Sequence, residues 1–92
     1  MALLSYYVYI LRSLKDGRYY IGSTSDVNAR LNFHNAGKQR STKHRIPFEL
    51  VYQEELIDKT TALKREKQIK NYKGGEAFKR LLRDVAPPEA GH

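Results

Sequence analysis

Two aromatic segments on either side of an Asp-Gly pair constrain the fold of this chain most strongly. The segment from Tyr6 to Arg12 is aromatic and β-branched, as in a strand that is buried on both faces. Asp16-Gly17 follows, and such a pair readily adopts the positive φ angles of a tight turn. Arg18 to Ser23 then forms the second, antiparallel strand. The pattern predicts a β-hairpin whose apolar surface must be covered by other elements.

Capping residues and glycines divide the rest of the chain into one strand and three helices. Ser25 or Asp26 is suited to cap the first helix, and Asp58 or Thr60 the second. Gly74-Gly75 separates the second helix from the last one. The predicted elements are a helix from Val27 to Ala36, a strand from Phe48 to Gln53, a helix that ends near Tyr72, and a helix from Glu76 to Arg83. The order ββαβαα predicts an α/β domain of two or three layers.

The length and composition indicate one small globular domain. The chain has 92 residues, of which 40% are hydrophobic and 29% charged, so neither disorder nor a fibrous class is expected. No apolar run approaches the roughly 18 residues of a membrane span, and we expect no secretory signal. The absence of cysteine excludes disulfides and thiol catalysis, and the expected location is the cytoplasm. We expect a folded domain over residues 1–84 and a flexible tail over 85–92.

The charge balance points to a polyanionic partner. Seventeen lysines and arginines against ten acidic residues give a formal net charge of +7. A surplus of this size on a small domain creates a positive surface potential, which favours nucleic acid as the partner. The alternative is that the charge serves solubility alone.

Three charged or titratable residues lie on the apolar sides of the predicted helices. At about 100° per residue, Arg30 and His34 fall on the same side as Val27, and they are neighbours at i and i+4. Glu66 lies among the apolar positions of the second helix, which are Ala62, Leu63 and Ile69. Removing such charges from water costs several kcal/mol unless they are paired or coordinated. They therefore form either a satisfied structural network, for example an Arg30–Glu66 ion pair at the sheet edge, or a polar cleft beside the sheet.

Tyrosines add hydroxyl groups to the same region. Five of the seven tyrosines lie in the predicted hairpin, where Phe, Val or Ile would serve a purely structural role. A buried tyrosine hydroxyl needs a hydrogen-bond partner. Paired strands can bring Tyr9 and Tyr20 side by side on one face, which favours the polar cleft.

These residues occur in an order that resembles the GIY-YIG endonuclease superfamily. Tyr7-Val8-Tyr9 and Tyr20-Ile21-Gly22 are separated by ten residues and are similar to the two-part signature of that family. Arg30 follows after seven more residues, with His34 one helical turn later. Ala62 to Glu66 is similar to the segment that carries the family's metal-binding Glu. The match runs from about Tyr6 to Tyr72 and is closest to the small stand-alone bacterial members.

The resemblance implies a three-stranded antiparallel sheet flanked by helices and a nuclease that uses one Mg²⁺ or Mn²⁺ ion. By position, Glu66 would ligate the metal and Arg30 would hold the scissile phosphate. Tyr9 would be the general base or would position the attacking water, while Tyr20 and His34 complete the cluster. Gly22 would let the backbone turn into the helix. His34 titrates closer to neutrality than a tyrosine, so it is a rival for the role of base.

Basic residues surround the expected site. We read Lys38 to Arg45 as a polar loop, and the second helix carries several lysines around Glu66. Such residues bind phosphates without reading sequence, so the expected selectivity is weak or based on nucleic-acid structure. The predicted substrate contacts are Gly22, Lys38, Arg40, Lys43, Arg45, Lys67 and Lys70.

The sequence thus favours a metal-dependent endonuclease that hydrolyses phosphodiester bonds in DNA. The alternative is a DNA- or RNA-binding module with negligible catalysis. A third hypothesis is a domain recruited by a partner protein that supplies specificity.

Overall fold

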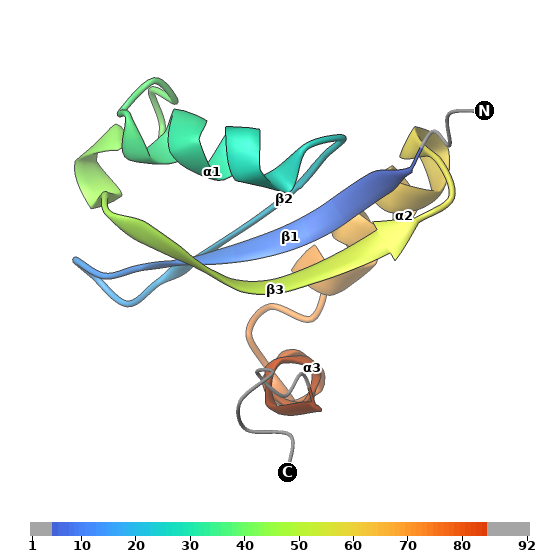
Figure 1. Ribbon diagram of the computed structural model, residues 1–92. Helices are drawn as coiled ribbons and strands as arrows, with labels where there is room; N and C mark the ends of the chain where they lie inside the picture. Colours follow the sequence, from blue (N-terminus) through green and yellow to red (C-terminus); the bar gives the residue numbers. More distant parts are fainter. Residues whose placement is uncertain (1–4, 85–92) are drawn as a thin grey trace, which may run out of the picture.

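The computed structural model describes residues 5–84 and confirms the order ββαβαα (Figure 1). The predicted tail, 85–92, lies outside the described residues. The elements are β1 (Tyr6–Ser13), β2 (Tyr19–Thr24), α1 (Val27–Asn35), a short 3₁₀ helix (Lys43–Arg45), β3 (Phe48–Leu56), α2 (Lys59–Lys70) and α3 (Glu76–Asp84).

The three strands form one antiparallel sheet in the order β2-β1-β3. The central strand β1 is buried from Val8 to Leu11, as its unbroken apolar sequence predicts. Gly17 has a φ of +74° in the β1–β2 turn, which is the conformation expected of the Asp-Gly pair. Strand β2 lies at the edge of the sheet and is therefore open along one side.

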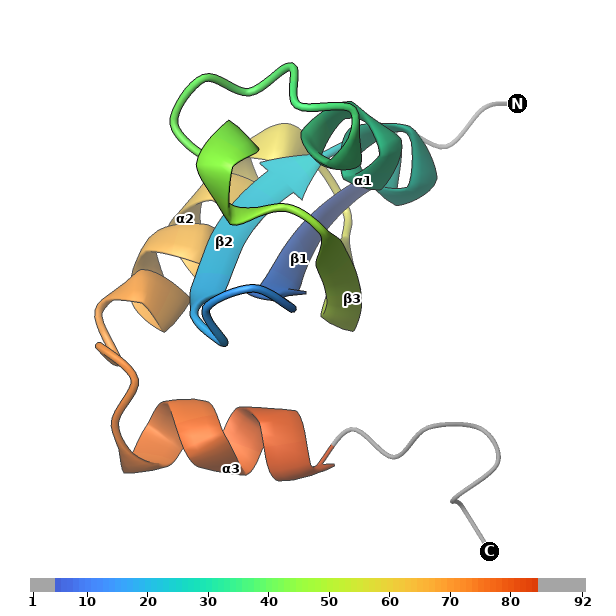
Figure 2. The same cartoon turned by 90° about the vertical axis from the view of Figure 1, so that its left-hand side faces the viewer.

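Helices cover both faces of the sheet, so the domain has three layers (Figures 1 and 2). Helix α1 packs on the face that carries Tyr9 and Leu11, and α2 packs on the face that carries Val8 and Ile10. The alternation of side chains along β1 separates these two cores. Residues from the two faces can therefore meet only around an edge of the sheet, and β2 forms one of its two edges.

Helix α3 lies below the other elements and is set apart from α1 and α2 (Figure 2). Its buried anchor is Phe78, whose ring meets Tyr19 of β2 at 5.1 Å between centroids. None of the helices described within residues 5–84 is long and apolar enough to cross a membrane.

The structure corrects several details of the sequence-based prediction. Asp26 and Asp58 are the caps of α1 and α2, each accepting a bond from the backbone N–H three residues later. The predicted loop after α1 contains the 3₁₀ helix, and β3 continues to Leu56. Leu63 was predicted on the apolar side of α2 but is 47% exposed, because α2 meets the sheet through Ala62 and Ile69.

Candidate active site

Tyr9 and Tyr20 lie on the α1 side of the sheet, as predicted. They are diagonal neighbours, because Tyr9 pairs with Gly22 and Leu11 pairs with Tyr20. Their ring centroids are 6.3 Å apart, and the Tyr20 ring also contacts the His34 ring at 4.7 Å. Tyr9 is almost fully buried and Tyr20 is half-buried, so the cluster extends from the core toward the surface.

Gly22 has a different role from the backbone turn expected for it. It lies inside β2, directly opposite Tyr9, and α1 begins only at Val27. A Cβ atom at this position would lie 2.6 Å from the Tyr9 hydroxyl oxygen and 2.8 Å from Cζ. The missing side chain therefore provides the space into which the Tyr9 ring leans.

A hydrogen bond joins the two residues that competed for the role of base. The Tyr9 hydroxyl lies 3.2 Å from His34 Nε2, and His34 is only 1% exposed on the inner side of α1. On its other side, His34 Nδ1 lies 3.0 Å from the Thr42 hydroxyl. Thr42 was not among the residues predicted from the sequence, because a threonine in a polar loop carries no periodic signal.

Burial shifts the pKa values of both Tyr9 and His34. It raises the pKa of the Tyr9 hydroxyl far above the usual value, and nearby Tyr20 raises it further. Among the charged groups that act on this hydroxyl, Arg30 lowers its pKa and Glu66 raises it. Burial, and then the charge of Arg30, lower the pKa of His34, so its ring is neutral at neutral pH. A protonated phenol thus faces a neutral imidazole.

Arg30 projects from the first turns of α1 beside a pocket of about 320 Å³. None of the ion pairs among residues 5–84 includes Arg30. Its guanidinium instead rests 5.1 Å from the centroid of the Phe33 ring, a contact that orients the charge without neutralising it. Asp26 also lines the pocket, but its carboxylate accepts the capping bond from the Ala29 N–H. Arg30 is therefore available to an anion.

Glu66 reaches the edge strand from α2, on the other face of the sheet. Its Oε1 accepts a 2.7 Å hydrogen bond from Ser23 of β2, and its Oε2 lies 2.7 Å from Lys70 Nζ. The Arg30–Glu66 ion pair, which was the example of a structural network, is therefore not formed among residues 5–84. Arg30 and Glu66 come from helices on opposite faces, and Glu66 finds its cation one turn away on its own helix.

The donor set at Glu66 fits a hydrated Mg²⁺ or Mn²⁺ ion. Within residues 5–84, no group of three or more His, Cys, Asp or Glu side chains could hold a metal ion together. Mg²⁺ commonly uses one or two carboxylates and completes its shell with water and substrate phosphate oxygens. The Lys70 ammonium shows that Glu66 Oε2 accepts a cation at this position.

The predicted basic contacts fall into two groups. Arg45 and Lys70 already have acidic partners, Asp16 at 3.1 Å and Glu66 at 2.7 Å. The others are exposed and take part in none of the ion pairs among residues 5–84; they are Lys38, Arg40, Lys43 and Lys67.

Comparison with known proteins identifies the family of the chain. Residues 5–79 match the model of the GIY-YIG catalytic domain. The chain belongs to the GIY-YIG family. The match covers every residue that we place in the site, from Tyr9 to Glu66, so the chain is a member of a family of nucleases.

Small bacterial proteins are among its relatives. A UPF0213 protein of Staphylococcus epidermidis is 47% identical over 77 residues, which cover 83% of this chain and 93% of that protein. A UPF0213 protein of Staphylococcus aureus is 49% identical over 69 residues, covering 74% and 83%. The solution NMR structure of the UPF0213 protein BH0048 from Bacillus halodurans is similar with a TM-score of 0.51 and 34% identity, covering 96% of this chain and 88% of that one.

Proposed function

We propose that this GIY-YIG protein is a divalent-metal-dependent endonuclease that hydrolyses phosphodiester bonds in DNA, with weak or structure-based selectivity. The observation that carries the proposal is the hydrogen bond between Tyr9 and His34 beside Arg30, which has no acidic partner among residues 5–84. A structural core would favour a neutralised Arg30 and would not need a buried phenol–imidazole pair.

Arg30 is the group that binds the scissile phosphate. A guanidinium presents a planar set of N–H donors that matches two phosphate oxygens and stays charged at any physiological pH. Negative charge grows on these oxygens as water attacks phosphorus, so the contact strengthens in the transition state. Phe33 holds the guanidinium in place without competing for its charge.

Tyr9 and His34 act together in removing a proton from the attacking water. Tyr9 is a poor base by itself, because burial favours its protonated form. As Tyr9 passes its own proton to His34 Nε2, its oxygen takes a proton from the water. The new P–O bond forms as the bond to the leaving oxygen breaks, and that oxygen is protonated by solvent. Tyr9 and His34 thus act together as the general base.

Glu66 would hold the Mg²⁺ or Mn²⁺ ion through Oε2, while Ser23 keeps Oε1 in place. When bound, such an ion supplies Lewis-acid stabilisation of phosphate and leaving-group charge. Tyr20 packs against both Tyr9 and His34 and keeps their rings in contact. Lys38, Arg40, Lys43 and Lys67 would bind flanking phosphates and position the DNA without reading its sequence.

The proposal includes the location and the partners expected from the sequence. Its substrate is cytoplasmic DNA, and a partner protein could supply the specificity that one small domain lacks. Recruitment would appear as a stable protein that copurifies with the chain and directs cleavage to particular sites.

The test is a cleavage assay with purified protein on supercoiled plasmid, single-stranded DNA, branched DNA and RNA, with Mg²⁺ and with Mn²⁺. Glu66→Gln and Arg30→Gln should abolish cleavage and leave the melting temperature close to that of the wild type. Arg83→Gln on α3 removes one positive charge away from the site and should cleave normally. Cleavage that survives both site variants in folded protein would contradict the assigned roles.

The second candidate is a nucleic-acid-binding module, with DNA or RNA as ligand and negligible catalysis. The four exposed basic residues favour it, because they can bind phosphates whether or not the site is active. Salt-sensitive binding without cleavage, equal in the wild type and Glu66→Gln, would support this candidate in place of the nuclease.

A further inference from the structure

Thr42 is a buried polar residue in an otherwise exposed basic loop. It is 1% exposed, whereas its neighbours Ser41 and Lys43 are exposed. It also precedes the 3₁₀ helix directly, and its side chain points inward to His34. If Thr42 only filled space, a valine of nearly the same shape would serve equally well. The buried hydroxyl group therefore indicates a polar role for this residue.

The hydroxyl lies within a directional chain of hydrogen bonds. Thr42 Oγ1 can donate its single hydrogen to the backbone oxygen of Gln39, 3.4 Å away. With its hydrogen turned to Gln39, the lone pairs of Thr42 Oγ1 face His34 Nδ1 at 3.0 Å, and Nδ1 then acts as the donor. A neutral imidazole carries one N–H group, so His34 Nε2 is left as the acceptor for the Tyr9 hydroxyl at 3.2 Å.

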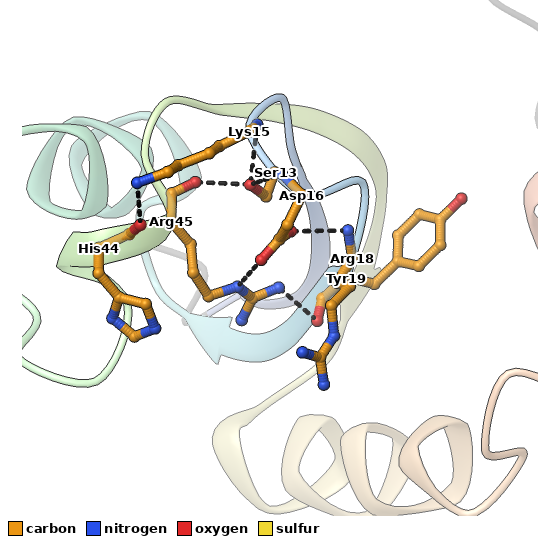
Figure 3. Close-up of polar contacts among 7 residues, drawn as sticks. All are labelled: Ser13, Lys15, Asp16, Arg18, Tyr19, His44 and Arg45. Atoms are coloured by element: carbon orange, nitrogen blue, oxygen red, sulfur yellow. Dashed lines mark hydrogen bonds and ion pairs between the residues drawn. The ribbon is translucent and has the colours of Figure 1, made fainter.

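The loop that carries Thr42 is held at its far end by the β1–β2 turn (Figure 3). Arg45 Nε pairs with Asp16 at 3.1 Å, and the buried Ser13 hydroxyl donates a 2.6 Å bond to the Arg45 backbone oxygen. Lys15 Nζ adds a 3.2 Å bond to the backbone oxygen of His44. We call these contacts the turn clamp.

The turn clamp also restrains the backbone of Thr42. The Arg45 N–H donates a 2.9 Å bond to the Thr42 backbone oxygen, so the clamped 3₁₀ helix and Thr42 form one unit. The Thr42 oxygen is therefore held at a fixed position beside Nδ1, and only its hydroxyl hydrogen is free to rotate. The position of the hydroxyl is set by the loop and not by His34.

We infer that Thr42 is a positioning residue: its hydroxyl holds His34 in the Nδ1–H tautomer, which leaves Nε2 free to accept the proton of Tyr9. The catalytic consequence rests on the proposed nuclease function. The tautomer itself does not, and it can be measured in the resting protein.

The experiment compares the wild type with Thr42→Val and Thr42→Ser. Valine has nearly the same shape but no hydroxyl, whereas serine keeps the hydroxyl. Nitrogen-15 NMR of the assigned His34 ring reports which ring nitrogen carries the proton, and the amide spectrum verifies that each variant is folded. Cleavage of supercoiled plasmid then gives kcat and KM separately.

We expect the Nδ1–H tautomer in the wild type and Thr42→Ser, and its loss in folded Thr42→Val. We also expect kcat of Thr42→Val to fall roughly 10- to 100-fold with KM unchanged, by analogy with the partners that orient metal-ligating imidazoles. A wild type with His34 in the Nε2–H form, or a Thr42→Val ring spectrum identical to the wild type, would overturn the inference. If the wild type cleaves nothing, the proposed function fails while the tautomer measurement still decides the role of Thr42.

Discussion

Lys70 Nζ lies 2.7 Å from Glu66 Oε2, so a lysine of the same helix occupies the carboxylate oxygen that we assign to the metal. The pair has i,i+4 spacing, and the Glu66 side chain is only 16% exposed whereas that of Lys70 is 53% exposed. A divalent cation must therefore displace the ammonium group before it can bind this oxygen.

Replacing Lys70 with methionine should strengthen metal binding. Removal of an ion pair worth about 0.5–1 kcal/mol corresponds to a roughly two- to fivefold lower Kd for Mn²⁺. Mn²⁺ titration followed by electron paramagnetic resonance measures this without any cleavage. Lys67→Met is the matched control, since Lys67 forms none of the ion pairs among residues 5–84. Equal or weaker affinity in Lys70→Met would argue against competition at Oε2.

Gly22→Ala should lower both stability and cleavage. The added methyl group would lie 2.6 Å from the Tyr9 hydroxyl oxygen, so Tyr9 must shift and its hydrogen bond to His34 is disturbed. Overpacking of this kind costs about 1–3 kcal/mol of unfolding free energy, measurable by urea denaturation. The double variant Gly22→Ala/Tyr9→Phe should recover part of the stability, because it removes the closest contact, but no activity. A fully stable and active Gly22→Ala protein would show that Tyr9 does not need this space.

The stability of the protein should fall between pH 7 and pH 5 because of His34. Its pKa is lower in the folded protein than the value near 6.5 of the unfolded chain, so the unfolded state takes up the proton first. Its contribution to stability is thus fully present above about pH 6.5 and is lost as the pH falls toward the folded pKa. The slope cannot exceed about 1.4 kcal/mol per pH unit.

Urea unfolding of the wild type and His34→Gln across this range isolates the effect. The carboxyl groups of Asp16 and Asp58 also have lowered pKa values, but they titrate in more acidic solution, below about pH 4. The difference in unfolding free energy between the two proteins should shrink as the pH falls. If this difference in unfolding free energy stays constant with pH, His34 has the same pKa in the folded and the unfolded protein.

The salt dependence of DNA binding should distinguish the exposed basic residues from those that already have acidic partners. Loss of one phosphate contact reduces the slope of log K against log salt concentration by about one. We expect this for Lys43→Gln, whose side chain is exposed and absent from the ion pairs of residues 5–84. Arg45→Gln should instead lower stability, because it breaks the bond to Asp16. Fluorescence anisotropy with a short DNA duplex measures the slopes, and equal slopes in wild type and Lys43→Gln would remove Lys43 from the interface.

Much of the fold could be predicted from local signals. The Asp16-Gly17 turn, the capping aspartates and the apolar runs each specify an element through contacts within a few residues, and the elements appear where those signals lie. The prediction was wrong at Leu63, because a helical wheel gives the apolar side of α2 but not the angle at which it meets the sheet.

The sequence by itself determined the elements, the positive charge and the order of Tyr9, Tyr20, Arg30, His34 and Glu66, because these depend on neighbours along the chain. Only the tertiary structure decided that β2 lies at one edge of the sheet, and that the helices carrying Arg30 and Glu66 pack on opposite faces. It also brought Ser23 to Glu66 and Thr42 to His34. A lone hydroxyl has no periodicity, so its partner is set by packing between distant segments and leaves no pattern in the sequence.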